Sequence, residues 1–417
     1  MTDHDDRLAS ELREYYAQLA RQPAPDVTGR VMAAADSRAL RLRRLSGIGG
    51  GMVAAAAAVA VVVLALANHG APSTTHPASS PTPLTNPSPT VTPEPAPVIP
   101  VGPPVQGFIA SDVTAISAQQ WWVIGYDGAS CSSASCTRIV HTTDGGQTFG
   151  SLPTPPVAPG QNGQQHNGMR FADAVDGWVF TASGALWATH DGGGHWTNDG
   201  GAGRVTDLEA SGGYVYVIAC AQATSCVLER SPAGQDAWST LAIPAGSGTL
   251  GHLNVNGSHV WLVPGGQGGT SLLVSADGGG HFSTDSVCTR DVGIVSVYAV
   301  NSSTVWATCA TGTQASALRS VDGGQHFSVV AGSPRLANFA SVGGVSSTEA
   351  VIGAQALFRT VDGGQTFATV EDNQTQWSMV GFTTSSNGFV FDVDASGQRA
   401  LWRSNDAGAH WYRVQFP

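Results

Sequence analysis

The sequence predicts an all-β fold, a seven-bladed β-propeller, and three observations support this prediction. One short pattern recurs seven times within residues 106–417 at spacings of 40 to 47 residues. A period in this range is typical of propellers with one four-stranded blade per repeat. Short runs of aromatic and β-branched residues precede the copies, as strands do. These 312 residues also divide into seven units of about 45 residues.

The recurring pattern has the composition of a hairpin turn. Its clearest copies run from Ser320 to Phe327 and from Thr360 to Phe367, with Asp and two glycines between apolar runs. A short carboxylate followed by glycine predicts a tight turn, in which the carboxylate accepts hydrogen bonds from backbone N–H groups just downstream. We therefore predict a structural role for the six central aspartates, Asp144, Asp191, Asp277, Asp322, Asp362 and Asp406.

Three further features define the copies. A degenerate copy, residues 230–238, has Pro232 at the aspartate position. The glycine after the aspartate is expected to adopt a positive φ, which glycine adopts at little cost, at Gly145, Gly192, Gly278, Gly323 and Gly363. Every copy ends in a large aromatic residue, which is expected to fold back against its blade: Phe149, Trp196, Trp238, Phe282, Phe327, Phe367 and Trp411.

The pattern resembles the Asp-box, or BNR repeat, which reads Ser/Thr-x-Asp-x-Gly-x-Thr/His-Trp/Phe. Bacterial sialidases, sortilin-type receptors, xyloglucanases and photosystem II assembly factors of the BNR-propeller type share this repeat. The resemblance extends over residues 106–417. It implies a propeller whose boxes lie at the blade edges, away from the central channel.

Histidine and arginine also recur at fixed places in the repeat. One histidine precedes the terminal aromatic in four copies, at His195, His281, His326 and His410. Equivalent positions in different blades lie far apart around a ring, so we predict that these histidines form no metal site. One arginine precedes the box Ser or Thr in four copies, at Arg230, Arg319, Arg359 and Arg403. These arginines are expected either to face solvent or to pair between blades.

The residues before the propeller predict a single-pass membrane protein. We assign residues 46–68 to a transmembrane helix, because the run from Ile48 to Ala67 carries no charge. Twenty residues extend about 30 Å as a helix, which is enough to cross a bilayer. A cleaved signal peptide is the alternative, since Ala65-Leu66-Ala67 fits a small-x-small cleavage site.

Charges on either side of this run predict its orientation. Arg41, Arg43 and Arg44 precede the run, and no charged residue follows until Glu94. The positive-inside rule therefore places residues 1–45, which we predict to be helical, in the cytoplasm and the propeller outside. Residues 69–105 hold 12 of the 23 prolines, so they predict an extended linker that reaches on the order of 100 Å.

Cysteine and charge content narrow the class of protein further. The six cysteines all lie in the propeller, at Cys131, Cys136, Cys220, Cys226, Cys288 and Cys309. An even number outside the cytoplasm predicts disulfides. Short loops favour pairing Cys131 with Cys136 and Cys220 with Cys226, which leaves Cys288 with Cys309. The propeller also holds 22 acidic residues, 11 arginines and no lysine, which excludes a basic face for nucleic acid.

The search for catalytic residues gives no signature. A sialidase needs an arginine cluster, a Tyr with a partner Glu, and an Asp acid/base, and the Phe/Tyr-Arg-Ile-Pro motif of that family is missing. The propeller supplies only Glu209, Glu229, Glu349 and Glu371 as glutamates. Its arginines outside the repeat show no spacing that predicts a cluster: Arg138, Arg170, Arg204, Arg290, Arg335, Arg399 and Arg413. No phosphate loop, nucleophile elbow or zinc motif occurs, so we predict no cofactor.

These observations favour a non-catalytic function. We predict a bacterial binding or assembly scaffold outside the cytoplasm, held by a single-pass anchor, that recognises an envelope protein or a glycan. An extracellular, sialidase-like glycoside hydrolase is the first alternative. A transmembrane sensor that signals through residues 1–45 is the second.

Overall fold

The structure is a computed structural model that describes residues 107–416 except 129–133, 159–166, 182–183, 200–202, 223–224, 245–246, 248, 265–268, 289–292, 373–374 and 395–398. The predicted cytoplasmic segment, transmembrane helix and linker lie outside the described residues. Within the described part of the chain, no helix is both long and apolar enough to span a membrane.

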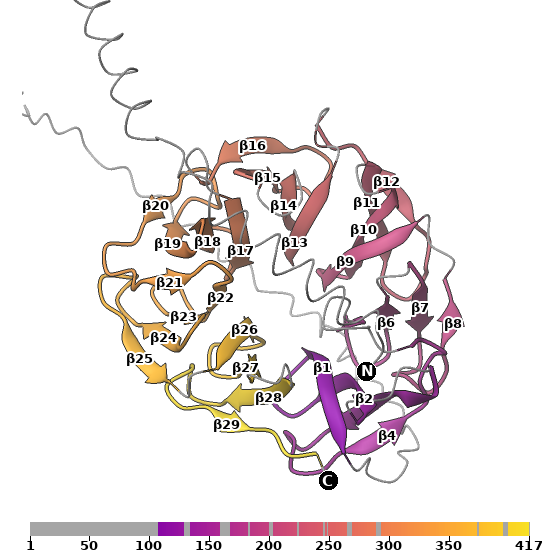
Figure 1. The fold of residues 1–417 in the computed structure, drawn as a ribbon. Helices are drawn as coiled ribbons and strands as arrows, with labels where there is room; N and C mark the ends of the chain where they lie inside the picture. The colour runs from indigo at the N-terminus through magenta and orange to yellow at the C-terminus, as the bar shows by residue number, and fades with distance from the viewer. Residues whose placement is uncertain are drawn as a thin grey trace, which may run out of the picture. The chain divides into compact units, whose positions relative to one another are not determined.

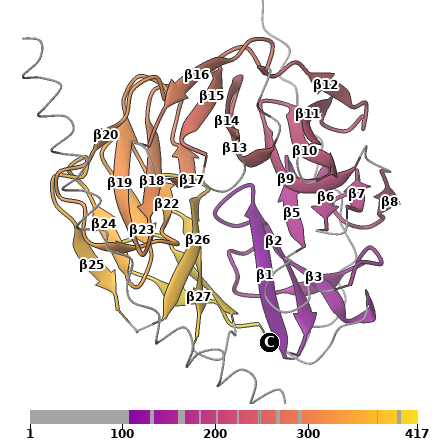
Figure 2. The same ribbon diagram turned by 45° about the horizontal axis from the view of Figure 1, so that its top comes forward.

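Seven antiparallel sheets follow one another around a ring (Figure 1), which confirms the predicted all-β, seven-bladed propeller. Each blade uses four strands that are consecutive in sequence and in space (Figure 2). The innermost strands of blades 1 to 7 are β1 (Phe108–Ala115), β5 (Gly168–Phe171), β9 (Arg204–Ser211), β13 (Leu250–Asn256), β17 (Gly293–Ala299), β22 (Ser341–Gly344) and β26 (Gln376–Phe382). The second strands are β2 (Trp121–Asp127), β6 (Gly177–Phe180), β10 (Tyr214–Gln222), β14 (His259–Pro264), β18 (Val305–Thr311), β23 (Ala350–Gly353) and β27 (Gly388–Val393).

The outer half of each blade carries the repeated turn. The third strands, which end at the box, are β3 (Thr137–Thr142), β7 (Leu186–Thr189), β11 (Ser225–Pro232), β15 (Ser271–Ser275), β19 (Gln314–Ser320), β24 (Leu357–Thr360) and β28 (Arg399–Ser404). The outermost strands are β4 (Gly150–Leu152), β8 (Thr197–Asn198), β12 (Ser239–Leu241), β16 (Ser283–Ser286), β20 (Ser328–Val329), β25 (Ala368–Glu371) and β29 (Tyr412–Arg413). A short strand, β21 (Leu336–Ala337), also pairs with β19, and a 3-10 turn, η1 (Ala134–Cys136), precedes β3.

The hydrophobic core is divided among the seams, where a seam is the interface between two neighbouring blades. Seven clusters of buried residues occur, and each joins residues of two neighbouring blades. Strands therefore bury apolar side chains on both faces, and second strands such as Trp121–Asp127 read as continuous apolar runs. A blade consequently depends on both of its neighbours for burial.

The ring closes through side chains at the seam between blades 7 and 1. Among the described residues, no sheet takes strands from both ends of the propeller. Instead, the ring of Phe416 packs against Phe108 and Phe149 at centroid distances of 4.8 and 4.9 Å. Nη1 of Arg399 donates to the carbonyl of Ser111 across the same seam, at 3.2 Å.

A hydrogen bond to the next blade's box recurs at several seams. The acceptor is the backbone carbonyl of the residue after the box aspartate. Trp122 donates to Gly192 at 3.2 Å and Trp261 donates to Gly323 at 2.7 Å, both through Nε1.

Arginine supplies the same bond where it precedes the box. Arg230 donates to the Gly278 carbonyl at 2.8 Å, and Arg359 donates to the Ala407 carbonyl at 2.8 Å. Of the two roles expected for these arginines, pairing between blades is therefore observed for Arg230 and Arg359. In blade 5 Arg319 lies over the ring of Trp306, whose Nε1 is buried without a partner.

Candidate functional site

Polar side chains on the innermost strands meet near the ring centre, far from the boxes. Asp112 on β1 follows Ser111, which forms a bulge against β2. Its Oδ1 accepts from the backbone N–H of Val113, and its Oδ2 accepts from that of Met169 in blade 2, both at 2.8 Å. Burial raises the pKa of Asp112, and the Arg170 guanidinium acts against this effect. Asp112 therefore ties blade 1 to blade 2.

Asp207 on β9 repeats this arrangement two seams further on. It follows the bulged residue Thr206, just as Asp112 follows a bulged serine. Its two carboxylate oxygens accept from the backbone N–H groups of Leu208 and of Leu253 in blade 4, both at 2.9 Å. Each aspartate therefore uses both carboxylate oxygens to accept backbone hydrogen bonds, one of which comes from the next blade.

An ion pair crosses the seam between blades 2 and 3. Nη2 of Arg170 on β5 lies 2.9 Å from Oε1 of Glu209 on β9, and the two side chains are 31% and 22% exposed. Burial raises the pKa of Glu209 to about 7, although the Arg170 charge acts to lower it. Nε of Arg170 is buried without a partner. Burial therefore shifts Glu209 toward its protonated form relative to an exposed glutamate.

Tyr298 reaches across the inner strand of a neighbouring blade. Its hydroxyl donates to the carbonyl of Phe382 in blade 7 at 2.6 Å and accepts from the N–H of that residue at 3.1 Å. Gly344 on β22 of blade 6 leaves room for this part of blade 5, because a Cβ there would meet the side chains of Val300, Trp306 and Tyr298. Tyr298 thus ties blade 5 to blade 7.

The six predicted box aspartates lie elsewhere, one in each of six hairpin turns. Their Oδ1 accepts from the box Ser or Thr hydroxyl at 2.7–2.9 Å. It also accepts from the backbone N–H four residues on, at 2.8–3.0 Å. The five glycines named above have φ between 73° and 79°. The turns thus have the predicted geometry, and the structure does not bring these aspartates together.

The four box histidines are also kept apart. Nδ1 of each lies 2.6–2.7 Å from Oδ2 of the aspartate in its own box. In the part of the chain that the structure describes, no three metal-ligating side chains form a cluster that could hold a metal ion.

We expect the box aspartates to make the fold sensitive to acid. The Thr366 hydroxyl, and then its backbone N–H, lowers the pKa of Asp362 to about 2, and Asp144, Asp322 and Asp406 also have pKa values of about 2. A carboxylate whose pKa is lower in the folded state than in the unfolded state stabilises the fold at pH values above its unfolded pKa. This stabilisation is lost as the pH falls through the folded pKa. Urea unfolding of the full-length protein should show this loss between about pH 4 and pH 2.

Asp362→Asn tests this dependence. It should reduce the loss of stability between these pH values, while Asp372→Asn, at an acid outside the boxes, should leave the loss unchanged. An equal pH dependence in both variants would contradict the expectation.

The degenerate copy differs from the prediction. Ser231 and Trp238 are seven residues apart, like the hydroxyl and aromatic residues of the other boxes, and Ser231 pairs with β10 at the buried end of β11. The residue two places after the box hydroxyl is then Ala233, so placing Pro232 at the aspartate position was wrong. The turn carries Asp236 three residues later, with φ at +46°.

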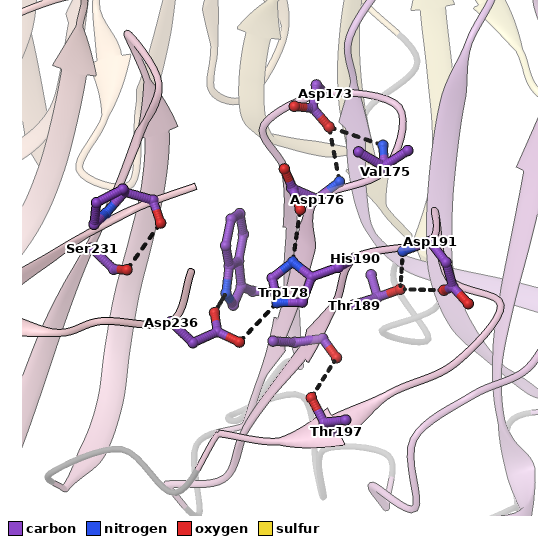
Figure 3. Close-up of polar contacts among 12 residues, drawn as sticks. Asp173, Val175, Asp176, Trp178, Thr189, His190, Asp191, Thr197, Ser231 and Asp236 are labelled. Carbon is purple, nitrogen blue, oxygen red and sulfur yellow. Dashed lines mark hydrogen bonds and ion pairs between the residues drawn. The ribbon is translucent and has the colours of Figure 1, made fainter. Parts of the chain in front are cut away.

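Asp236 bonds across the seam instead of within its own turn (Figure 3). Its Oδ2 lies 2.9 Å from Nε2 of His190 in blade 2, and its Oδ1 accepts from Nε1 of Trp178 at 3.2 Å. Nδ1 of the same histidine lies 2.7 Å from Oδ1 of Asp176, in the loop between β5 and β6. One imidazole thus connects two carboxylates from two blades.

Two of the expected disulfides are present. Cys220 and Cys226 pair directly across the β10–β11 hairpin, and Cys288 pairs with Cys309. Cys136 is also disulfide-bonded, and its expected partner Cys131 lies outside the described residues. Each disulfide seen in full joins residues that the sequence analysis paired.

Loop length predicts how much each disulfide contributes to stability. Cys288 and Cys309 are 21 residues apart, and Cys220 and Cys226 are 6 apart. In the chain-entropy account, the longer loop contributes about 3 kcal/mol and the shorter about 2 kcal/mol. In denaturant unfolding, the Cys288→Ala/Cys309→Ala variant should therefore have a lower free energy of unfolding than the Cys220→Ala/Cys226→Ala variant. The reverse order would contradict an entropic origin.

Sequence reasoning missed the residues of the ring centre. Arg170 and Glu209 were noted without any spacing that joins them, because the bond between them depends on ring closure. A weak signal existed for Asp112 and Asp207, since Ser111-Asp112-Val113 and Thr206-Asp207-Leu208 share a hydroxyl-Asp-apolar order.

Comparisons with known proteins show the fold. No protein-family model matches the chain, and no curated protein matches it in sequence. The solved structure of YCF48 bound to D1 peptide is similar, with a TM-score of 0.52 and 16% identity over 73% of this chain and 95% of that chain. YCF48 from Cyanidioschyzon merolae gives a TM-score of 0.50 and 13% identity, over 74% and 98%. A GH74 enzyme from Niastella koreensis gives 0.42 and 12%, over 75% and 66%.

Proposed function

We propose that the propeller is a non-catalytic binding module, which acts outside the cytoplasm as an assembly or recognition scaffold for an envelope protein. The proposal keeps the anchor predicted from residues 46–68. The disulfides Cys220–Cys226 and Cys288–Cys309 support the location, because disulfides persist in oxidising compartments.

The observation that carries the proposal is the state of the acids at the ring centre. A glycoside hydrolase needs two carboxyl groups that are free to act on one bond. Asp112 and Asp207 each accept two backbone hydrogen bonds, and Glu209 is paired with Arg170. All three carboxyl groups are engaged in joining blades, which favours binding over hydrolysis.

The fold comparison adds an analogy. A propeller of similar fold, YCF48, has been solved with D1 peptide bound. At 16% identity this is a property of that protein, and it supports only the idea that a ring of this kind can serve as a peptide-binding surface.

One observation favours the hydrolase alternative. Glu209 has a pKa of about 7, as a general acid requires. Asp207, two residues earlier on the same strand, could serve as its partner only after giving up its hydrogen bond to blade 4.

The test is a cross-linked pull-down of the full-length protein from native membranes, analysed by mass spectrometry. We expect a stoichiometric envelope protein that is lost when residues 106–417 are deleted. Absence of such a partner, together with glycan hydrolysis that Glu209→Gln abolishes, would replace the scaffold with the hydrolase. If the variant that lacks residues 106–417 still captures the partner, the binding site lies outside the propeller.

A further inference from the structure

The seam between blades 2 and 3 is held together differently from the others. In the other seams, the inter-blade hydrogen bonds described above use a backbone group on one side, as between Asp112 and Met169 or Trp261 and Gly323. At the 2–3 seam both partners are side chains: Arg170 with Glu209, Trp178 and His190 with Asp236, and Trp238 with Asp199.

The geometry of His190 determines its protonation. Both ring nitrogens lie within 2.7–2.9 Å of a carboxylate oxygen. A neutral imidazole has one N–H, so it can donate to only one carboxylate, while an imidazolium donates to both. The observed arrangement is therefore that of a charged histidine. Loss of the proton would leave a nitrogen lone pair facing a carboxylate oxygen.

The charged groups that bond His190, one from each of the two blades, are both acidic. The β5–β6 loop contributes Asp176, and also Asp173, which accepts from the N–H groups of Val175 and Asp176. The blade 3 turn contributes Asp236. Further acids follow on neighbouring elements: Asp191 in the box, Asp199 after β8 and Glu229 on β11. A proton on His190 thus offsets repulsion within an acidic seam.

We propose that the seam between blades 2 and 3 is a pH-responsive joint, closed by protonated His190 and loosened when the imidazole loses its proton. The joint is independent of the proposed scaffold function. It gives the ring one seam whose cohesion depends on the pH of the compartment that the propeller occupies.

The direction of the response follows from linkage. Burial acts to lower the pKa of His190, but the hydrogen bonds that its ring donates to Asp176 and Asp236 outweigh burial and raise this pKa above its ordinary value. A histidine whose pKa is higher in the folded state than in the unfolded state stabilises the fold fully at pH values below its unfolded pKa. This stabilisation is lost as the pH rises through the folded pKa. Burial raises the pKa of Asp199 to about 6, so this acid also favours the folded state at lower pH. Burial also raises the pKa of Glu209, in the same seam, to about 7. All three groups therefore make the seam weaken as pH rises.

The test is hydrogen exchange of the full-length protein by mass spectrometry, with protection factors compared at about pH 6 and about pH 8. We expect protection of the 172–176 and 233–237 turns to fall about tenfold at the higher pH, after correction for intrinsic exchange. His190→Gln should remove most of this difference, because these two turns hold the carboxylates that bond His190, and should leave both turns poorly protected. His326→Gln, at an exposed histidine of blade 5, should behave like the wild type.

A second measurement covers the case in which His190→Gln does not fold. Imidazole NMR of the wild type should give His190 a pKa above the ordinary histidine value of about 6.5, and Asp236→Asn should lower it. A wild-type His190 whose pKa is not raised, or an unchanged pH response in His190→Gln, would overturn the proposal.

Discussion

Replacing Trp261 with Phe is expected to lower the free energy of unfolding by about 1–3 kcal/mol more than replacing Trp306 with Phe. Both indoles are buried, so the two variants lose similar apolar area. Only Trp261 donates a seam hydrogen bond, to the Gly323 carbonyl at 2.7 Å. Its loss leaves that carbonyl without the indole donor, whereas Nε1 of Trp306 has no partner to lose.

Denaturant unfolding of the full-length protein, with the wild type alongside, measures this difference. The comparison is well matched, because both tryptophans lie on second strands at the same place relative to the box. Equal losses in the two variants would show that the box carbonyl contributes nothing to the seam. Arg230 and Arg359 bond the equivalent carbonyls of other boxes. Those bonds would then also be expected to contribute nothing to their seams.

Replacing Arg170 with Met is expected to destabilise the fold strongly above neutral pH and only weakly in mild acid. Without the guanidinium, Glu209 has no counter-charge and its pKa moves further above 7. Breaking a buried ion pair costs about 3–5 kcal/mol, and partial exposure of both side chains, 31% and 22%, places the expected loss near 2 kcal/mol at about pH 8. At about pH 5 Glu209 is protonated in the folded state, so little is lost.

Unfolding free energies at the two pH values test this result, and the double variant Arg170→Met/Glu209→Gln is the control. It removes the unpaired charge and should recover most of the stability at the higher pH. A loss that is the same at both pH values, or that the double variant does not recover, would assign the effect to lost packing of the arginine instead.

Local chemistry explains what the sequence predicted well. Each box turn is determined within eight residues: an aspartate, a hydroxyl two places earlier and a glycine with positive φ suffice to close it. Repetition then reveals the blade, so fold class and blade number follow from pattern alone. This reasoning failed at the degenerate third copy, because Asp236 bonds His190 of the neighbouring blade instead of closing its own turn.

The sequence by itself therefore determined the seven blades, their turns and the pairing of Cys220 with Cys226 and of Cys288 with Cys309. Only the tertiary structure decided which polar residues meet. Asp112 bonds Met169 57 residues away, Arg170 bonds Glu209 39 away, and Tyr298 bonds Phe382 84 away. The physical reason is ring closure: a contact between blades depends on the curvature set by all seven seams, which no local pattern records.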